Sequence, residues 1–290
     1  MLISVYIAGL TMARNEILVI GAGLVGSEFA NEEGVVVVDR SRVNITDFKQ
    51  VNVLISQQSW AAVINCAVDS DTARAEQGRG QPWGCNAFRV NCLGAVNIAM
   101  ACFARDVFLV HPNTDFAYRD TDADPGPFSP DRSICTNLNQ MTVYGWTKAM
   151  ALVQIAELGD KFASIGLSYP SKPGAGFLAK ALLEFPSFLT KQFITPTLVP
   201  EFVDVAMNVA RGRIVGRFNV ATPDVTTPYD FVTAFAKARG INREFPKSDK
   251  VNPLKPIRGG LDVASTQQAL GVRFKTSQEQ AEWLAQNWPK

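Results

Sequence analysis

Short hydrophobic runs alternate with segments of helical spacing along the first half of the chain. A run such as the four valines at 35–38 has no polar face, which is typical of a strand buried on both sides. Strands are expected at 16–20, 35–38, 60–66, 107–110 and 165–168, and helices at 24–33, 88–103 and 143–158. This β-α-β order predicts an α/β fold with a doubly wound parallel sheet and helices on both faces.

The second half of the chain is interrupted by prolines, and its pattern is less regular. The elements expected there are a returning strand near 217–222, a helix over 228–239, an extended loop over 247–260, and a final helix with Trp283 and Trp288 in or just after it. We therefore expect a larger sheet domain over 12–168, completed by the returning strand, and a mostly smaller lobe over 169–290.

Composition and charge narrow the classes of partner. The 290 residues are 47% hydrophobic and 19% charged, and a formal net charge of +1 argues against nucleic acid and against a polybasic membrane surface. No hydrophobic run approaches the ~18 residues that a membrane-spanning helix needs. Residues 1–12 have no leading positive charge, so we interpret them as an extra leader or as a start-site ambiguity with Met12 as the second candidate.

The cysteines and the histidine indicate a reducing, cytoplasmic location and no metal site. Five irregularly spaced cysteines without a C-x-x-C pair predict neither a disulfide framework nor a zinc site. The chain has one histidine, His111, which rules out a His-rich metal site. We expect it to orient a loop rather than to act as a catalyst.

A glycine-rich turn, Gly21-Ala22-Gly23-Leu24-Val25-Gly26, follows the first strand and opens a helix. Gly21 permits the tight turn, Gly23 lets the backbone approach a pyrophosphate, and Gly26 allows close packing of helix on strand. The N–H groups around Leu24 and Val25 then face the phosphates. The motif predicts a Rossmann-type dinucleotide-binding domain over 12–168, and the alternative is a plain structural turn.

An acidic residue and two arginines end the second strand. Asp39 is placed to accept hydrogen bonds from the ribose hydroxyls of adenosine, which favours NAD. Arg40 and Arg42 offer guanidinium groups to a 2′-phosphate, which favours NADP, although both also suit a solvated loop. The choice between NAD and NADP therefore stays open.

A Y-x-x-x-K pair, Tyr144 and Lys148, lies on the helix expected over 143–158. Residues four apart share one helix face, so we expect the ammonium to lower the pKa of the phenol toward the working range. Thr114 and Asp115 come just after a strand, at the edge of the sheet where ligands bind. Each feature also has an ordinary interpretation, an exposed lysine on a helix and a Pro-Asn-Thr-Asp turn.

Taken together, the glycine turn, Thr114, Tyr144 and Lys148 resemble the extended short-chain dehydrogenase/reductases, and more narrowly the dTDP-4-dehydrorhamnose reductases. The resemblance covers about residues 16–275 and is strongest in the first 150. Segments similar to motifs of that family are Asp39–Asp47, Val63–Ala67, Ala75–Glu76, Val90–Asn91, His111–Phe116 and Val143–Lys148.

The resemblance implies an oxidoreductase that reduces a ketone with NAD(P)H, the family's default substrate being a nucleotide-linked 4-keto-6-deoxy sugar. It implies that Tyr144 gives a proton to the forming alkoxide, that Lys148 also holds the nicotinamide ribose, and that Thr114 hydrogen-bonds the carbonyl oxygen. Asn91 matches a helix asparagine with a structural or water-relay role, and Cys66 and Ala67 are expected to line the cofactor with their backbone.

Positions expected to contact substrate are Asp115, Tyr169, Lys172 and Phe177. The sequence also departs from the family: the glycine turn is one residue shorter, and residues 166–177 replace the usual sugar-nucleotide stretch. The alternatives are therefore a sugar-nucleotide epimerase, a reductase of another keto substrate, or a non-catalytic regulatory subunit similar to the β-subunit of methionine adenosyltransferase. The resemblance also suggests a possible homodimer, through the helices that carry Asn91 and Tyr144.

Overall fold

The computed structural model describes residues 16–184 and 186–289. Its centre is a six-stranded sheet in the order β2-β1-β3-β4-β5-β9, in which every neighbouring pair is parallel. The strands are β1 (Ile17–Ile20), β2 (Val35–Val38), β3 (Ala62–Asn65), β4 (Phe108–Thr114), β5 (Phe162–Leu167) and β9 (Gly216–Val220). The predicted doubly wound α/β fold is therefore confirmed.

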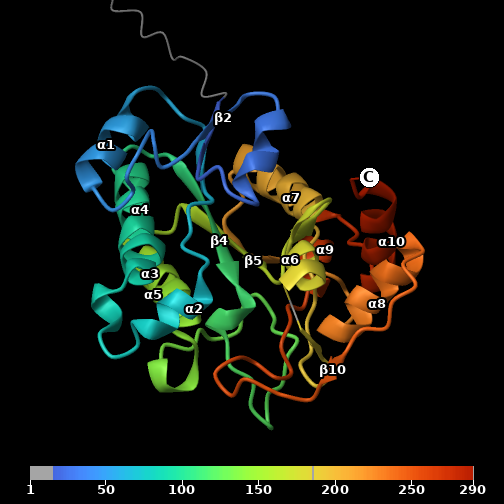
Figure 1. Ribbon diagram of the computed structural model, residues 1–290. Coiled ribbons are helices and arrows are strands. Elements are labelled where there is room, and N and C mark those ends of the chain that lie inside the picture. Colours follow the sequence, from blue (N-terminus) through green and yellow to red (C-terminus); the bar gives the residue numbers. More distant parts are fainter. Residues whose placement is uncertain (1–15, 185, 290) are drawn as a thin grey trace, which may run out of the picture.

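Helices cover both faces of the sheet (Figure 1). Alternate strand residues point to opposite faces. Val63 packs in one core with α1 (Phe48–Ser56), α4 (Ala95–Phe103) and α5 (Val143–Leu158). Its neighbour Ile64 packs in the other core with α7 (Val199–Gly212). Burial on both faces explains why the strand sequences are hydrophobic without alternation.

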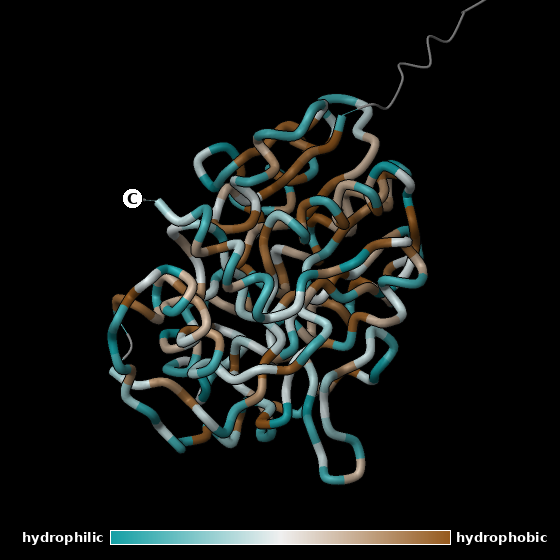
Figure 2. Tube along the Cα trace, turned by 90° about the vertical axis from the view of Figure 1, so that its right-hand side faces the viewer, coloured by the Kyte–Doolittle hydropathy of each residue, from teal (hydrophilic) through white to brown (hydrophobic). Residues whose placement is uncertain are grey.

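A third hydrophobic cluster lies away from the sheet. It is built from α6 (Phe177–Glu184), α8 (Pro228–Arg239) and α10 (Ser277–Asn287), with Phe188 of the short strand β8 (Phe188–Leu189). Strand β8 pairs with β10 (Lys247–Ser248). Figure 2 shows brown hydrophobic stretches running through the interior and teal positions along the outer loops. The remaining elements are α2 (Thr72–Gln77), α3 (Asn86–Phe88), α9 (Ala264–Leu270), β6 (Ser171–Lys172), β7 (Ala175–Gly176), the π-helical η3 (Arg89–Gly94) and the 3-10 helices η1 (Gly26–Asn31), η2 (Pro82–Gly84), η4 (Asp115–Ala117) and η5 (Leu138–Gln140).

Two of the predicted helices, over 143–158 and 228–239, are confirmed at both ends. Thr142 caps α5 by accepting a hydrogen bond from Gly145 N, and Thr227 caps α8 by accepting one from Asp230 N. Gly240 closes α8 in the left-handed conformation that glycine favours, with φ of 72°. Such caps satisfy backbone groups that the helix itself leaves unpaired.

Three predictions are corrected. The segment 24–33 forms only the 3-10 helix η1, and the helix over 88–103 is interrupted by the π-helical η3. Strand β4 does not end at Val110 but continues to Thr114, with Pro112 paired to Ile165 of β5, so the turn interpretation of this segment is wrong. The proline cannot donate to the ladder, but its carbonyl still accepts, and Lys148 uses it.

The sequence pattern missed α1, α2, α6, α7 and α9. Within the described residues, no helix is both long and hydrophobic enough to cross a membrane. The start-site question at residues 1–12 falls outside the described residues.

Candidate active site

A cavity of about 1150 Å³ opens at the carboxyl ends of the parallel strands. This is the edge at which doubly wound sheets bind ligands, because the loops there diverge to opposite faces. Of the predicted site residues, those that line the cavity are Gly21, Gly23, Leu24, Val25, Asp39, Arg40, Cys66, Ala67, Thr114, Asp115, Tyr144, Lys148 and Tyr169. Those that do not are Gly26, Asn91, Lys172 and Phe177.

Steric limits explain the glycines of the turn. Gly21 has φ of +108°, and a Cβ there would lie 2.5 Å from Ala67 N. A Cβ on Gly26 would lie 1.7 Å from the carbonyl oxygen of Gly21. A Cβ on Gly23 would find no protein atom within 4 Å, although the residue lines the cavity. Gly21 and Gly26 therefore build the turn, while Gly23 leaves room on its cavity side.

Asp39 follows β2 and stays ionised. Its Oδ1 accepts hydrogen bonds from Ser41 Oγ at 2.6 Å and Ser41 N at 2.9 Å. The hydroxyl bond, followed by the backbone bond, lowers the pKa of this exposed carboxyl. Arg40 lines the cavity beside it, whereas Arg42 lies outside the lining and donates to Gln57 at 3.4 Å.

The residues at the end of β3 line the cavity next to the glycine turn. Ala67 N donates to Asn65 Oδ1 at 3.2 Å, which fixes the backbone that passes under the turn. Burial raises the pKa of the Cys66 thiol to about 12, so the thiol stays protonated and uncharged. Cys66 and Ala67 thus offer backbone and small side chains to a ligand.

Several contacts fix the N-terminus of α5, which carries Tyr144. Val143 N donates to Glu76 Oε2 at 3.1 Å, and Glu76 is itself ion-paired with Arg79. Arg79 also donates to the carbonyls of Leu138 and Met141, at 2.9 and 2.8 Å. The helix end that carries Tyr144 is therefore held in place by Glu76 and, through the preceding segment, by Arg79.

Lys148 points back to strand β4. Its Nζ donates to the carbonyl of Pro112 at 2.6 Å and lies 3.5 Å from Nε2 of His111. Burial lowers the pKa of Lys148 to about 8. Burial and the nearby ammonium lower the pKa of His111 well below its usual value, so the ring is neutral. His111 lies within β4, and its Nδ1 lies 3.4 Å from Nδ2 of Asn65.

The pKa of Tyr144 shifts in the direction opposite to the prediction. Burial raises it, with further contributions from the negative charges of Asp115 and Asp69. The expected lowering by Lys148 does not offset this rise, because its ammonium is bonded to the Pro112 carbonyl rather than to the phenol. Tyr144 is therefore a protonated phenol at neutral pH, able to give a proton but not to take one.

Asn91 lies behind the cavity wall, in the π-helical η3. Its Oδ1 accepts from Asp69 N at 2.7 Å, and its Nδ2 donates to Asp69 O and Thr147 Oγ1 at 3.0 and 3.1 Å. These bonds join the loop after β3 to α5. The position supports the structural alternative rather than direct contact with a cofactor.

Thr114 and Asp115 end β4 on the other side of the cavity. Thr114 Oγ1 donates to Asp115 Oδ1 at 3.2 Å, and Ser168 Oγ donates to Asp115 Oδ2 at 2.9 Å. Despite these bonds, burial raises the pKa of Asp115 to about 6. The carboxyl is 3% exposed, so it is the least solvated acid of the cavity wall.

The predicted substrate residues separate into two pairs. Asp115 and Tyr169 line the cavity, and the Tyr169 hydroxyl accepts from Gln192 Nε2 at 3.0 Å. Phe177 supports Tyr169 from behind, with ring centroids 4.9 Å apart. Lys172 points elsewhere, since its Nζ pairs with Glu28 at 2.8 Å and donates to Ser27.

Sequence reasoning missed Lys255, which lines the same side of the cavity as Asp115. No local motif marks it, because it lies in a stretch that reads only as an extended loop. It also missed Asp69, which Arg74 holds with two bonds of 2.9 Å. In the part of the chain that the structure describes, no group of three or more His, Cys, Asp or Glu could hold a metal ion.

Known proteins are similar to this chain over most of its length. A family model described as the RmlD substrate binding domain matches residues 15–280. The Haloferax volcanii protein named probable low-salt glycan biosynthesis reductase Agl14 is 24% identical over 277 residues, covering 89% of this chain and 88% of that protein. A dTDP-4-keto-6-deoxy-D-glucose reductase of Streptomyces niveus is 30% identical over 251 residues, covering 82% of each.

Solved structures show the same architecture. The dTDP-4-dehydrorhamnose reductase of Bacillus anthracis, crystallised with NADP, has a TM-score of 0.79 at 18% identity. The match covers 94% of this chain and 98% of that one. At this identity the likeness concerns the fold.

Proposed function

The chain belongs to the family of the RmlD substrate binding domain, and on that premise we propose that it is an NAD(P)H-dependent reductase of a ketone carried by a nucleotide-linked sugar. One observation carries the proposal: Thr114, Tyr144 and Lys148 line the same cavity as the glycine turn. A nicotinamide cofactor and a ketone would therefore meet in one chamber. The names of the relatives support a 4-keto-6-deoxy sugar as the substrate.

The residues present fit such a cofactor. The open side of Gly23 leaves room for the pyrophosphate, where a Cβ would otherwise intrude. Asp39 and Arg40 stand at the adenosine end, one suited to ribose hydroxyls and the other to a 2′-phosphate. Lys148, which lines the same cavity, suits the nicotinamide ribose. Both NADH and NADPH remain candidates on this set of donors.

The chain's own groups account for the proton transfer. A bound nicotinamide cofactor supplies the hydride that reduces the carbonyl carbon. The phenol of Tyr144 gives its proton to the carbonyl oxygen, and its raised pKa keeps it protonated for that task. Thr114 Oγ1 donates to the same oxygen once it turns from Asp115. The Lys148 ammonium, which bonds to the Pro112 carbonyl in this structure, stabilises the phenolate left behind once it turns toward the phenol.

Replacing Tyr144 by Phe tests this proposal. We expect kcat to fall by about 10²- to 10⁴-fold, because the acid is lost, while affinity for NADPH stays the same. The assay follows loss of NADPH and NADH absorbance against a panel of keto-sugar nucleotides, and Tyr229→Phe, outside the cavity lining, is the matched control. Full activity of Tyr144→Phe would contradict the proposal.

The same assay separates the alternatives. Interconversion of two sugar epimers without net oxidation of NADPH would indicate an epimerase. Turnover only with a ketone that carries no nucleotide would indicate a different keto substrate. Cofactor binding that Tyr144→Phe leaves unchanged, without turnover on any ketone, would indicate a regulatory subunit.

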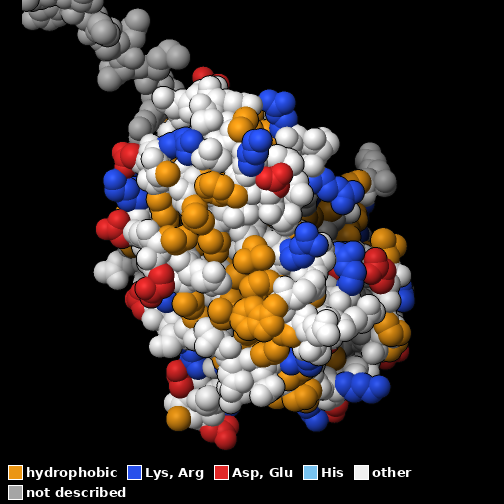
Figure 3. Space-filling view, turned by 90° about the vertical axis from the view of Figure 1, so that its left-hand side faces the viewer, with side chains coloured by type: hydrophobic (Ala, Val, Ile, Leu, Met, Phe, Trp, Pro, Cys, Tyr) orange, Lys and Arg blue, Asp and Glu red, His pale blue; other side chains and the backbone are white. Residues whose placement is uncertain are grey.

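We also propose a cytoplasmic homodimer in which the sheet domain over 12–168 binds the cofactor and the lobe over 169–290 contributes to substrate binding. Figure 3 shows hydrophobic side chains gathered on the face that carries α1 and α4. Exposed members on η2, η3, α4 and α5 are Trp83, Leu93, Met100 and Val153. Contact between copies would cover them, and sedimentation velocity measures the mass in solution.

A further inference from the structure

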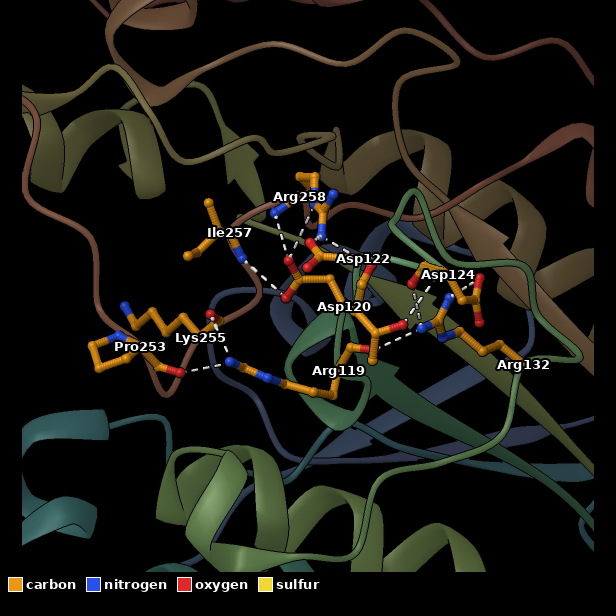
Figure 4. A network of polar contacts seen from close by, with 10 residues as sticks. Arg119, Asp120, Asp122, Asp124, Arg132, Pro253, Lys255, Ile257 and Arg258 are labelled. Carbon is orange, nitrogen blue, oxygen red and sulfur yellow. Dashed lines mark hydrogen bonds and ion pairs between the residues drawn. The ribbon is translucent and has the colours of Figure 1, made fainter.

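Two segments far apart in sequence are joined beside the cavity (Figure 4). We call this contact the clasp, formed by Arg119 and Asp120 on one side and residues 253–258 on the other. Arg119 Nη1 donates to the carbonyls of Pro253 and Lys255, at 2.7 and 3.2 Å. Pro253 and Lys255 lie 134 and 136 positions after Arg119 in the sequence.

The second half of the clasp uses a buried carboxylate. Asp120, with a side chain 6% exposed, accepts hydrogen bonds from Ile257 N at 3.3 Å and Arg258 N at 3.2 Å. The Arg258 guanidinium lies 3.6 Å from Asp120 and 2.9 Å from Asp122. Gly126 N adds a bond to the Arg258 carbonyl at 2.9 Å. Residue 255 is thus held from both flanks.

The clasp places the Lys255 side chain in the cavity lining. Its Nζ lies over the ring of Phe116, 5.1 Å from the centroid. Burial lowers the pKa of Lys255, and the negative charge of Asp115 offsets part of that effect. Among the described residues, no hydrogen bond or ion pair joins this ammonium to a protein acceptor. Its N–H donors are therefore available to acceptors that a ligand in the cavity supplies.

The other cations of the cavity lining are already engaged or stand elsewhere. Arg74 holds Asp69 with two bonds, and Lys148 bonds to the Pro112 carbonyl. Arg40 stands at the adenosine end beside Asp39. On the side of Asp115 and Phe116, Lys255 is the cation that the described lining offers.

We propose that Lys255, positioned by the clasp, binds the diphosphate of the substrate and thereby selects nucleotide-linked sugars over free ones. This inference rests on the proposed reductase function, which it deepens. A compact ammonium with three donors suits phosphate oxygens, which spread their negative charge over several acceptors.

Replacing Lys255 by Gln tests the contact in the full chain. The probe is dTDP, which carries the diphosphate without a sugar, titrated by calorimetry into protein saturated with NADP. We expect the Kd of dTDP and the KM of the sugar nucleotide to rise about 10- to 100-fold, as for loss of a charge-assisted hydrogen bond. Affinity for NADPH should not change, and kcat should change less than KM.

Two further variants control for charge and for fold. Lys255→Arg keeps the charge and should retain most of the dTDP affinity. Lys250→Gln removes an exposed lysine of the same loop and should behave as the unmodified protein. Circular dichroism checks that each variant is folded.

The clasp is tested by a double-mutant cycle. Arg119→Met removes both bonds to the carbonyls that flank residue 255, and we expect weaker dTDP binding. In the Lys255→Gln background the same change should cost nothing further, because the two act through one contact. An equal penalty in both backgrounds would show that Arg119 does not act through Lys255, and would overturn the positioning part of the proposal.

The outcomes distinguish this inference from the proposed function. Unchanged dTDP affinity in Lys255→Gln, or no dTDP binding by the unmodified protein, overturns the inference even if a ketone is reduced. Lys255-dependent dTDP binding without reduction of any ketone supports the inference while the reductase proposal fails.

Discussion

The cavity has two halves, built in different ways. The half proposed to bind the cofactor, here the cofactor half, comes from residues close in sequence, the turn at 21–26 and the strand ends at 39–40 and 65–67, and it relies on backbone geometry. The half proposed to bind substrate, here the substrate half, joins Asp115, Tyr169 and Lys255, which come from three distant segments, and it relies on side chains. The first half is therefore a local property of the sequence, whereas the second depends on the tertiary fold.

The same residue type shows the contrast in electrostatics. Asp39 is exposed, and a hydroxyl hydrogen bond from Ser41 lowers its pKa. Asp115 is buried, and burial raises its pKa to about 6 even though Ser168 and Thr114 donate to it. Exposure to solvent therefore determines the direction of the pKa shift of these two carboxyl groups more strongly than their hydrogen bonds do. The three predictions below test this contrast, from the largest expected effect to the smallest.

Gly26→Ala should damage the cofactor half most. The new Cβ would lie 1.7 Å from the Gly21 carbonyl oxygen, so the turn must move. We expect a loss of about 3 kcal/mol in the free energy of unfolding, as for severe overpacking, together with weaker NADPH binding. Urea denaturation and a fluorescence titration measure the two effects.

Gly23→Ala sharpens the same test, since its Cβ would meet no protein atom within 4 Å. It should keep the urea midpoint and lose only cofactor affinity. If Gly26→Ala proved as stable as Gly23→Ala, the steric account of the turn would be wrong.

Asp115→Asn should stabilise the substrate half above pH 6. The folded pKa of Asp115, about 6, lies above the ordinary 3.8, so the folded state binds the proton more tightly than the unfolded chain. Stability is then fullest below the ordinary pKa and is lost as pH rises through about 6. The amide avoids that cost, and we expect a gain of about 2 kcal/mol at pH 7.5 that disappears near pH 4.

Urea unfolding at several pH values measures this gain. Asp160→Asn, which replaces an exposed acid, is the control and should show no such pH dependence. A gain that is the same at pH 4 and pH 7.5 would mean that ionisation of Asp115 is not its cause.

Affinity for NADPH should fall as pH rises through about 8. Burial lowers the pKa of Lys148 to about 8, so the ammonium is present below that value and is lost above it. We expect a decrease of up to about tenfold per pH unit, the limit for one proton. Titrations from pH 6 to 9.5 test this, and Lys148→Met should give a flat profile. If NADPH affinity fell only above pH 10, deprotonation of Lys148 near pH 8 would not be the cause.

The cofactor half could be predicted from the sequence because the motifs that mark it are local. The turn at 21–26 needs glycine for reasons that act within a few residues and one neighbouring strand. The predicted bounds of helices α5 and α8 are confirmed, and the capping residues Thr142 and Thr227 are likewise local in sequence. The proposed acid Tyr144 was found through its spacing from Lys148, but its pKa depends on where the ammonium points, which the fold decides.

The substrate half could not be reached in that way. Lys255 acquires its place only when the clasp closes a separation of 134 positions or more. Lys172 illustrates the opposite error, since its position in sequence suggested substrate and the fold gave it Glu28 as partner. Helix α7 packs its buried residues in the sheet core, and it was missed because a proline stands at its start within a segment that other prolines interrupt.

The clasp has a consequence for how the protein can change. Arg119 and Asp120 hold carbonyl and N–H groups of residues 253–258, and every residue type but proline supplies both. The side chain at position 255 is therefore not needed to hold the loop of residues 253–258 in place. Single substitutions at this position can exchange the group that faces the substrate while the scaffold stays intact, which makes position 255 a site where relatives with different substrates can diverge.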